Sequence, residues 1–89
     1  MKAFITVIGK DSVGIIAHIA AGLAKQEVNI LDINQTVMEG TFTMVMMVDV
    51  SNSRVPFSEL TEEMEKTGRE LGLSVQIQHE DIFNSMHRL

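Results

Sequence analysis

The sequence predicts an α+β fold in which one four-stranded antiparallel sheet carries two helices on one of its faces. Two observations predict it. Apolar residues recur with the period of strands and then of helices, in the order strand, helix, strand, strand, helix, strand. Two of the strand candidates are apolar on both faces, as central strands are, whereas the other two alternate, as edge strands do. With 89 residues, of which 45% are hydrophobic, the chain is expected to form one small domain with a packed core.

The first strand and the first helix are predicted over residues 2–9 and 13–27. The strand candidate is rich in β-branched side chains and apolar on both faces, which indicates a central position. The helix candidate places its apolar side chains on one stripe and ends in polar residues. Ser12 is the expected N-cap and Asp11 the competing one, because either side chain accepts a hydrogen bond from a helix N-terminus.

The second and third strands are predicted as a hairpin. Residues 29–39 alternate between apolar and polar side chains, which indicates an edge strand. Glu39-Gly40 supplies the short turn that a hairpin needs. Residues 41–50 are apolar on both faces, so they are expected near the centre of the sheet.

A second helix and a last strand follow a polar loop. Pro56 suits the first turn of a helix, and apolar residues recur at helical spacing from there to about Leu71. Gly72 is the expected C-cap, because glycine readily adopts the left-handed conformation that ends many helices. Residues 73–80 alternate cleanly and predict the second edge strand. This order of elements, βαββαβ, is that of the ferredoxin-like fold.

The end of the chain is expected to behave as a separate segment. We divide the sequence into a domain over residues 1–80 and a C-terminal amphipathic tail over residues 81–89, with Asp81 as its cap. The tail repeats apolar side chains at near-helical spacing, at Ile82, Phe83, Met86 and Leu89. We therefore expect a short C-terminal helix that docks on an apolar surface, within one subunit or across an interface.

One face of the predicted sheet has no helix to cover it. Two helices cover a single face in this fold, so the other face would present Val45 and Met47, with Phe4 and Ile8 beside them. A monomer would leave this apolar patch in water. We therefore expect a homo-oligomer, at least a dimer.

Composition narrows the classes of function. The formal net charge is −5 and the sequence shows no broad basic patch, so direct binding of nucleic acid or of an anionic membrane is not expected. The chain has no cysteine, which excludes disulfides, thiolate catalysis and cysteine-based metal sites. Met1 leads directly into a strand-like run, without the pattern of a signal peptide or a transmembrane span, so a cytoplasmic location is expected.

Two short phrases carry the strongest functional signal. Lys10-Asp11-Ser12-Val13-Gly14-Ile15-Ile16 lies where an apolar strand runs into an amphipathic helix. Unpaired backbone N–H groups at such a helix start lie at the positive end of its dipole, and they suit a carboxylate or another small anion. Val28-Asn29-Ile30 follows the helix, and its asparagine amide both donates and accepts. Together the phrases indicate a receptor for a small molecule that bears an amine and a carboxylate.

These phrases, in this order of elements, resemble the ACT domain, a small amino-acid-sensing module with a βαββαβ fold. The resemblance covers roughly residues 2–80, and the whole chain is similar to small free-standing ACT proteins of bacteria and archaea. Those proteins have an ending similar to His79-Glu80-Asp81-Ile82-Phe83, with Met86-His87-Arg88 after it. The chain is also similar to the ACT repeats of the glycine-cleavage-system transcriptional repressor.

The resemblance implies a regulatory module that binds a small molecule, such as an amino acid, between subunits of a homo-oligomer. The ligand-bound state would then be passed to a protein partner. No cofactor is implied. The alternative is a pure assembly module, in which the same surfaces pair subunits and no ligand exists.

The resemblance also implies the site residues in the loop after the first strand. It implies Asp11 as a polar contact and backbone N–H groups from Ser12, Val13, Gly14 and Ile15. Many ACT domains have proline just before the glycine, where this chain has Val13. The loop is therefore expected to be less preorganised than in those domains.

The other half of the implied site is contributed by the second subunit. It consists of Asn29 as a side-chain amide contact and Ile30 as a neighbouring main-chain contact. The alternative is purely structural. Gly14 would then permit close packing of the helix on the sheet, Asp11 and Ser12 would cap the helix, and Asn29 would only turn the chain.

Histidines and methionines leave further alternatives open. His18 follows Gly14 by one helical turn and faces either the ligand or solvent. His79, Asp81 and His87 are residue types that bind zinc or nickel, but their spacing matches no compact motif, so no metal site is predicted. Four methionines are expected to fill the core rather than bind copper, at Met38, Met44, Met46 and Met47.

An enzyme is not predicted. Acylphosphatases share the expected fold but need an arginine in the first loop, where this chain has Lys10. Copper chaperones of this fold need paired cysteines. The three histidines are scattered, and no Ser-His-Asp spacing or paired-carboxylate cleft can be argued from them.

Overall fold

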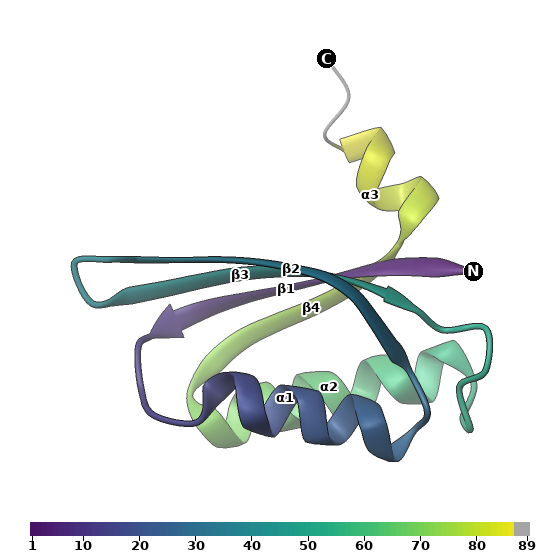
Figure 1. Cartoon of the computed structure of the whole chain (residues 1–89), viewed down its shortest axis with the longest axis horizontal. Coiled ribbons are helices and arrows are strands. Elements are labelled where there is room, and N and C mark those ends of the chain that lie inside the picture. The colour runs from purple at the N-terminus through teal and green to yellow at the C-terminus, as the bar shows by residue number, and fades with distance from the viewer. Residues whose placement is uncertain (87–89) are drawn as a thin grey trace.

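The computed structural model of the chain consists of a sheet and a layer of helices (Figure 1). It describes the backbone of residues 1–86 and the side chains of residues 1–82 and of Ser85. The elements, in chain order, are β1 (Lys2–Lys10), α1 (Ile15–Lys25), β2 (Asn29–Met38), β3 (Thr41–Asp49), α2 (Phe57–Leu71), β4 (Leu73–His79) and α3 (Glu80–Met86). The predicted α+β fold class and the ferredoxin-like order of elements are confirmed.

The four strands form one antiparallel sheet in the order β2-β3-β1-β4. The two strands that are apolar on both faces, β1 and β3, lie at the centre. The two alternating strands, β2 and β4, lie at the edges, as the patterns predict. The central pair is in continuous register from Lys2 opposite Asp49 to Lys10 opposite Thr41.

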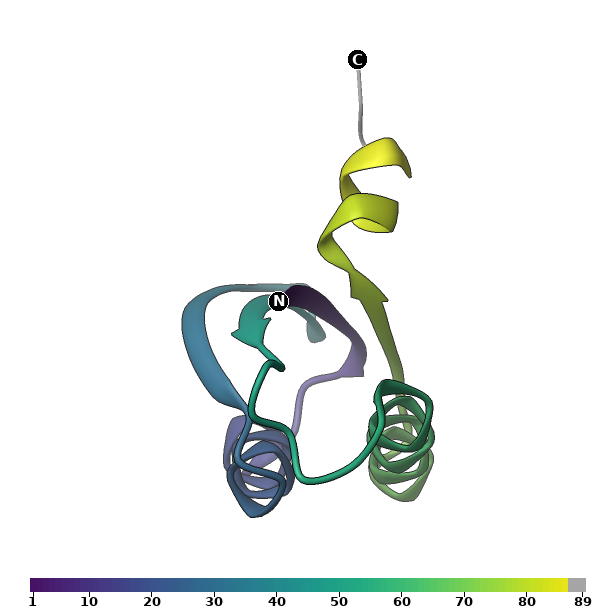
Figure 2. The same ribbon diagram turned by 90° about the vertical axis from the view of Figure 1, so that its right-hand side faces the viewer.

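Helices α1 and α2 lie side by side on one face of the sheet, and the core lies between the two layers (Figures 1 and 2). Alternate residues of each central strand point into it. Ile5 and Val7 of β1 and Met44 and Met46 of β3 are fully buried. The methionines at these two positions are therefore core residues, as expected. The expectation is wrong for Met38, which is 70% exposed at the end of the edge strand β2, and for Met47, which is half-buried on the other face of the sheet.

Helix α2 begins and ends close to the predicted positions. Pro56 immediately precedes it, in an extended conformation that fits the residue before the first turn. Gly72 ends it with φ 73°, in the left-handed region, and its N–H donates to the carbonyls of Gly68 and Arg69. The predicted C-cap is confirmed.

The edge strand β2 is less covered than its apolar alternation suggests. Its register with β3 shifts between Ile30 and Asp32, which makes Leu31 the extra residue of a bulge. Ile33 and Val37 lie opposite the buried Met46 and Phe42, yet they remain 39% and 52% exposed. The reason is that β2 is the outermost strand, where the helix layer ends.

Helix α3 follows β4 without a loop and rises on the side of the sheet away from α1 and α2 (Figures 1 and 2). The predicted short C-terminal helix is therefore present, and it starts at Glu80 rather than after Asp81. Ile82 is 54% exposed, so this side chain is only partly covered within its own subunit. The expected docking of Phe83, Met86 and Leu89 lies outside the described residues. Within residues 1–86 no helix is long and apolar enough to span a membrane.

Candidate ligand-binding site

The loop between β1 and α1 turns on Gly14. This residue is the N-cap of α1, with φ 86° and ψ 7°, a left-handed conformation that is strained for other residues. The predicted caps are wrong, because no side chain caps α1 and the helix begins at Ile15 rather than at Val13. Ser12 and Asp11 lie too early in the loop, since the turn at Gly14 separates them from the first helical residue.

The start of α1 leaves its backbone donors available. Among the described residues, the first N–H to find a helical acceptor is that of His18, which donates to the carbonyl of Gly14 at 3.0 Å. The preceding N–H groups, from Gly14 to Ala17, have no acceptor one turn earlier in the helix. The first turn carries no acidic side chain. The positive end of the helix dipole is thus uncompensated and suits a small anion.

A hydrogen bond ties this loop to the β2–β3 turn. The N–H of Asp11 donates to the carbonyl oxygen of Gly40 at 2.9 Å. A hollow of about 260 Å³ lies between the loop, the start of α1 and the hairpin. Its lining residues are Asp11, Ser12, Gly14, Ile15, Ile16, Ala17, Gln35, Val37 and Phe42. The hollow is small, open and part polar, which suits a ligand below drug size.

The two halves of the predicted site do not meet within one chain. Asn29 is exposed at the start of β2, and Ile30 is half-buried against the core. Helix α1, of 11 residues, separates them from Gly14 by roughly 16 Å. Val13 is fully exposed and does not line the hollow. Asp11, Ser12, Gly14 and Ile15 are the predicted residues that do line it.

The structure adds His18 to the neighbourhood of the loop. A Cβ atom placed on Gly14 would lie 3.5 Å from Cδ2 and 3.8 Å from Nε2 of the His18 ring. The imidazole therefore lies over the glycine and is exposed to solvent. The sequence could have predicted this proximity from the four-residue spacing of Gly14 and His18, because residues at this spacing lie one above the other on a helix.

The histidine-rich end of the chain is arranged differently from a metal centre. The ring of His79 packs on that of Phe57, with centroids 4.1 Å apart. Asp81 is exposed, and His87 lies outside the described residues. Within residues 1–86 no three potential ligands come together.

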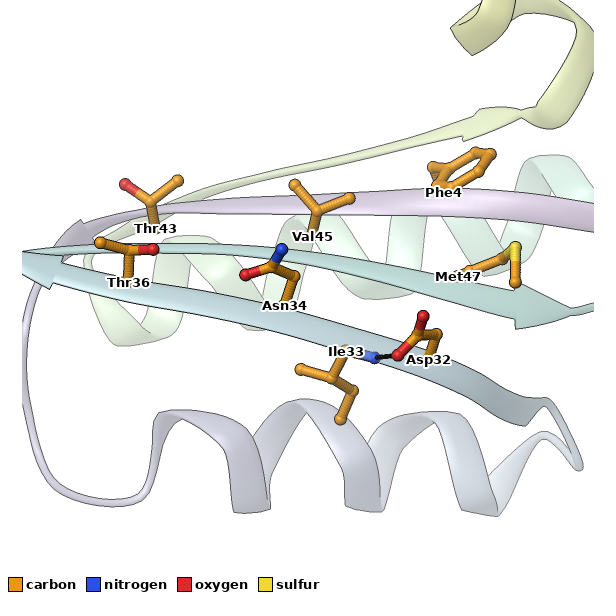
Figure 3. Close-up of a pocket in the computed structure, with 8 residues that line it drawn as sticks. All are labelled: Phe4, Asp32, Ile33, Asn34, Thr36, Thr43, Val45 and Met47. Carbon is orange, nitrogen blue, oxygen red and sulfur yellow. Dashed lines mark hydrogen bonds between the residues drawn. The ribbon is translucent and has the colours of Figure 1, made fainter.

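A second hollow lies on the sheet face away from the helices (Figure 3). It has a volume of about 480 Å³. Phe4, Val45 and Met47 point into it from the central strands, and Asn34 and Thr36 point into it from β2 (Figure 3). The sequence prediction of an apolar patch on this face is confirmed, and the half-exposed side chains show that the single chain leaves it open.

This fold is that of a small α+β module with the ferredoxin-like order of elements. The sequence model of the ACT domain matches residues 2–78, and the chain belongs to the ACT domain family. The resemblance stated from the sequence is thus confirmed. ACT domains are in general regulatory modules that bind small molecules, often amino acids.

Two relatives match over their full lengths. A UPF0237 protein of Methanocaldococcus jannaschii is 51% identical over 88 residues, which cover 99% of this chain and 98% of that protein. A UPF0237 protein of Clostridium acetobutylicum is 54% identical over 89 residues, which cover 100% of both. The chain is therefore similar to proteins of the same size in bacteria and archaea.

Solved structures agree with this assignment. The ACT domain protein from Streptococcus pneumoniae has a TM-score of 0.81 and 42% identity, and the match covers 93% of each chain. The regulatory subunit of aspartate kinase from Thermus thermophilus has a TM-score of 0.66 and 25% identity, over 86% of this chain and 50% of that one. A putative glycine cleavage system transcriptional repressor, at a TM-score of 0.76 and 21% identity, shows the same fold.

Proposed function

We propose that the chain is a regulatory module that binds an amino acid between two subunits of a homo-oligomer. The bound state would be passed to a protein partner. The observation that carries the proposal is the position of the two half-sites, which lie at opposite ends of an exposed edge strand. One half-site is the Gly14 loop, and the other is Asn29.

The edge strand β2 supports pairing with a second copy. Nine of its ten residues are exposed and Ile30 is half-buried. An edge of this length presents a row of backbone N–H and C=O groups that a second strand can pair. Apolar side chains at Leu31, Ile33 and Val37 would gain cover from the partner subunit.

Antiparallel pairing of two β2 strands would complete the site. With a two-fold axis between Ile33 and Asn34, Asn29 of each copy lies opposite Met38 of the other. Met38 leads into the turn at Gly40, which holds the loop through the N–H of Asp11. The two half-sites, at opposite ends of a strand about 30 Å long, would thus lie close together across the two-fold axis.

The residues of this shared site match the groups of a free amino acid. The N–H groups at the start of α1 would bind the carboxylate, with support from the helix dipole. The Asp11 carboxylate or the Asn29 side-chain oxygen would accept hydrogen bonds from the ammonium. The apolar part of the hollow, at Ile15 and Val37, would hold the ligand's side chain.

Removal of the Asn29 amide tests the proposal. A thermal-shift panel of the standard amino acids first identifies a ligand, which at a hundredfold excess over its dissociation constant would stabilise the fold by about 2.7 kcal/mol. Calorimetric titration of Asn29→Ala should then show binding weakened by roughly 1–3 kcal/mol, or about 5- to 150-fold.

The matched control is Asn52→Ala, because Asn52 is an exposed asparagine on the turn after β3. This variant should bind as the wild type does. Equal affinity in Asn29→Ala, with the oligomer intact, would contradict the shared site. A panel with no stabilising amino acid would favour the alternative, an assembly module without a ligand.

A further inference from the structure

The uncovered face of the sheet is a second surface, distinct from the β2 edge. Helices α1 and α2 cover one face, and the other faces outward on the side where α3 rises (Figures 1 and 2). We call this surface the open face. Its central side chains are Phe4, Val45 and Met47, and Ile8 beside them is 45% exposed.

The open face is hollowed along β2 and β3. The hollow of about 480 Å³ shares Thr36 and Thr43 with a neighbouring hollow of about 520 Å³ that continues to the β2–β3 turn. Its polar side chains in the middle are neutral amides and hydroxyls that both donate and accept, such as Asn34 and Thr36. Asp32 is the charged residue among those that line the larger hollow. Apart from Asp32, the middle of the face can therefore pair with a copy of itself without opposing like charges.

Apart from Asp32, which lines the hollow, the charges of the open face lie at its ends. Every second residue of a strand shares a sheet face, which places Lys2 and Lys10 on the open face at the two ends of β1, and Asp49 on it at the end of β3. Asp32 lies near the start of β2. Depletion of charge in the centre, with a charged rim, is typical of protein–protein interfaces. A nucleic acid or an anionic surface would need the opposite arrangement.

The size of the open face fits a partner as large as the chain itself. Four strands of about nine residues span about 600 Å² per copy, so two faces packed together bury about 1,200 Å². That value is at the lower limit for a stable protein–protein interface. A small ligand would cover only the hollow.

Helix α3 would add to the area buried between two open faces. It projects on the side of the open face, at the end of β4 (Figure 2). Its Ile82 is 54% exposed in the single chain. Two copies packed face to face would each place this helix beside the edge of the other sheet. The exposed face and the exposed helix would then be covered by the same event.

We infer that the open face packs against the open face of a second copy about a two-fold axis, with α3 of each subunit flanking the other. This interface is separate from the proposed β2 pairing, which forms the ligand site. With both interfaces present, the assembly is a tetramer built from two kinds of dimer.

Two substitutions, each of which introduces a charge into one interface, test the two interfaces independently. Val45→Lys places a charge at the centre of the open face, and Ile33→Lys places one on the β2 edge. Light scattering after gel filtration should give four chains for the wild type and two chains for each variant. The double variant should be monomeric. Circular dichroism checks that each variant is folded.

The outcomes distinguish the two proposals. If the folded Val45→Lys variant keeps the mass of the wild type, the open-face inference is overturned. This holds for a tetrameric wild type and also for a dimeric wild type that Ile33→Lys dissociates. An unchanged mass in Ile33→Lys overturns the β2 pairing and leaves the open-face inference standing when Val45→Lys halves the mass. A wild-type monomer overturns both.

If Val45→Lys fails to fold, cross-linking tests whether two open faces pack together. The chain has no cysteine, so Val45→Cys introduces a unique thiol on the open face. A short bismaleimide should capture a covalent dimer of this variant. The matched control Glu62→Cys, on the exposed surface of α2, should not be captured. Absence of capture for Val45→Cys overturns the inference.

Discussion

The two outer surfaces of this molecule are both exposed in the single chain, but they differ in chemistry. The outer surface of α2 is densely charged, with exposed side chains at Glu62, Glu65, Lys66, Arg69 and Glu70. The open face of the sheet carries apolar and neutral polar side chains in its middle. The first surface is suited to water, whereas the second is the surface for which we infer a second copy as partner.

The difference between the two surfaces shows that one strand, β1, contributes side chains both to the core and to the open face. In β1, Ile5 and Val7 are fully buried under the helices, while their neighbours Phe4 and Ile8 are turned to the open face. A strand that faced water on one side would alternate apolar with polar residues, as β4 does. The apolar side chains on both faces of β1 are the reason why we infer that a second copy covers the open face.

The largest expected effect comes from the covered face. Ile5→Ala should lower the free energy of unfolding by about 2–5 kcal/mol, because the core cannot fully close the cavity. The control Val45→Ala should cost about 1 kcal/mol or less at protein concentrations too low for assembly, since Val45 is only half-buried. Urea unfolding measures both. Equal losses would contradict the difference between the two faces.

A smaller effect tests how closely the helix layer packs. A Cβ atom on Gly68 of α2 would lie 2.5 Å from Val75 Cγ2 and 3.0 Å from the Leu73 carbonyl oxygen. Gly68→Ala should therefore destabilise the fold by about 1–3 kcal/mol, although alanine is the better helix former.

The matched control is Gly22→Ala in α1, where the added Cβ would meet only the flexible end of Met64, at 2.9 Å. Because that side chain can move, helix propensity should dominate and stabilise the fold by up to about 1 kcal/mol. Thermal unfolding of the two variants should thus shift in opposite directions. A stabilised Gly68→Ala would show that α2 does not lie against β4 as closely as described.

The smallest effect concerns Asp49, at the charged rim of the open face. Hydrogen bonds from the side chain and the backbone N–H of Ser51 lower the pKa of Asp49 from 3.8 to about 2, with help from the N-terminal ammonium of Met1. The unfolded chain binds this proton more tightly, so the stabilisation is present above pH 3.8 and is lost as the pH falls toward 2.

Asp49→Asn removes this dependence. The difference in unfolding free energy between the wild type and the variant should be constant above about pH 5 and should shrink between pH 3.8 and 2. Urea titrations at several pH values measure it. A difference that persists unchanged at pH 2 would contradict the lowered pKa.

The sequence was most informative where the local pattern and the tertiary structure demand the same residue. Gly72 ends α2 in a left-handed conformation, as its position after the last apolar residue predicts. The start of α1 was less predictable. Ser12 and Asp11 are good caps by residue type, but the left-handed turn at Gly14 determines where the helix begins.

The candidate site was only partly predictable for a related reason. The residues of the Gly14 loop could be chosen from one continuous phrase. Their hydrogen bond to the β2–β3 turn, between Asp11 and Gly40, joins residues far apart in the sequence. The position of His18 over Gly14 also became clear only from the packing of α1, because a helical histidine is compatible with either surface.

The sequence by itself determined the order of elements, the family, and which strands are central, because these depend on periodicities and phrases within short windows. Only the tertiary structure decided how far the helix layer reaches over β2 and on which side of the sheet α3 rises. It also decided that Asn29 lies a helix length away from the loop it was expected to complete. These are relations between distant segments, fixed by how the two layers pack rather than by any local preference.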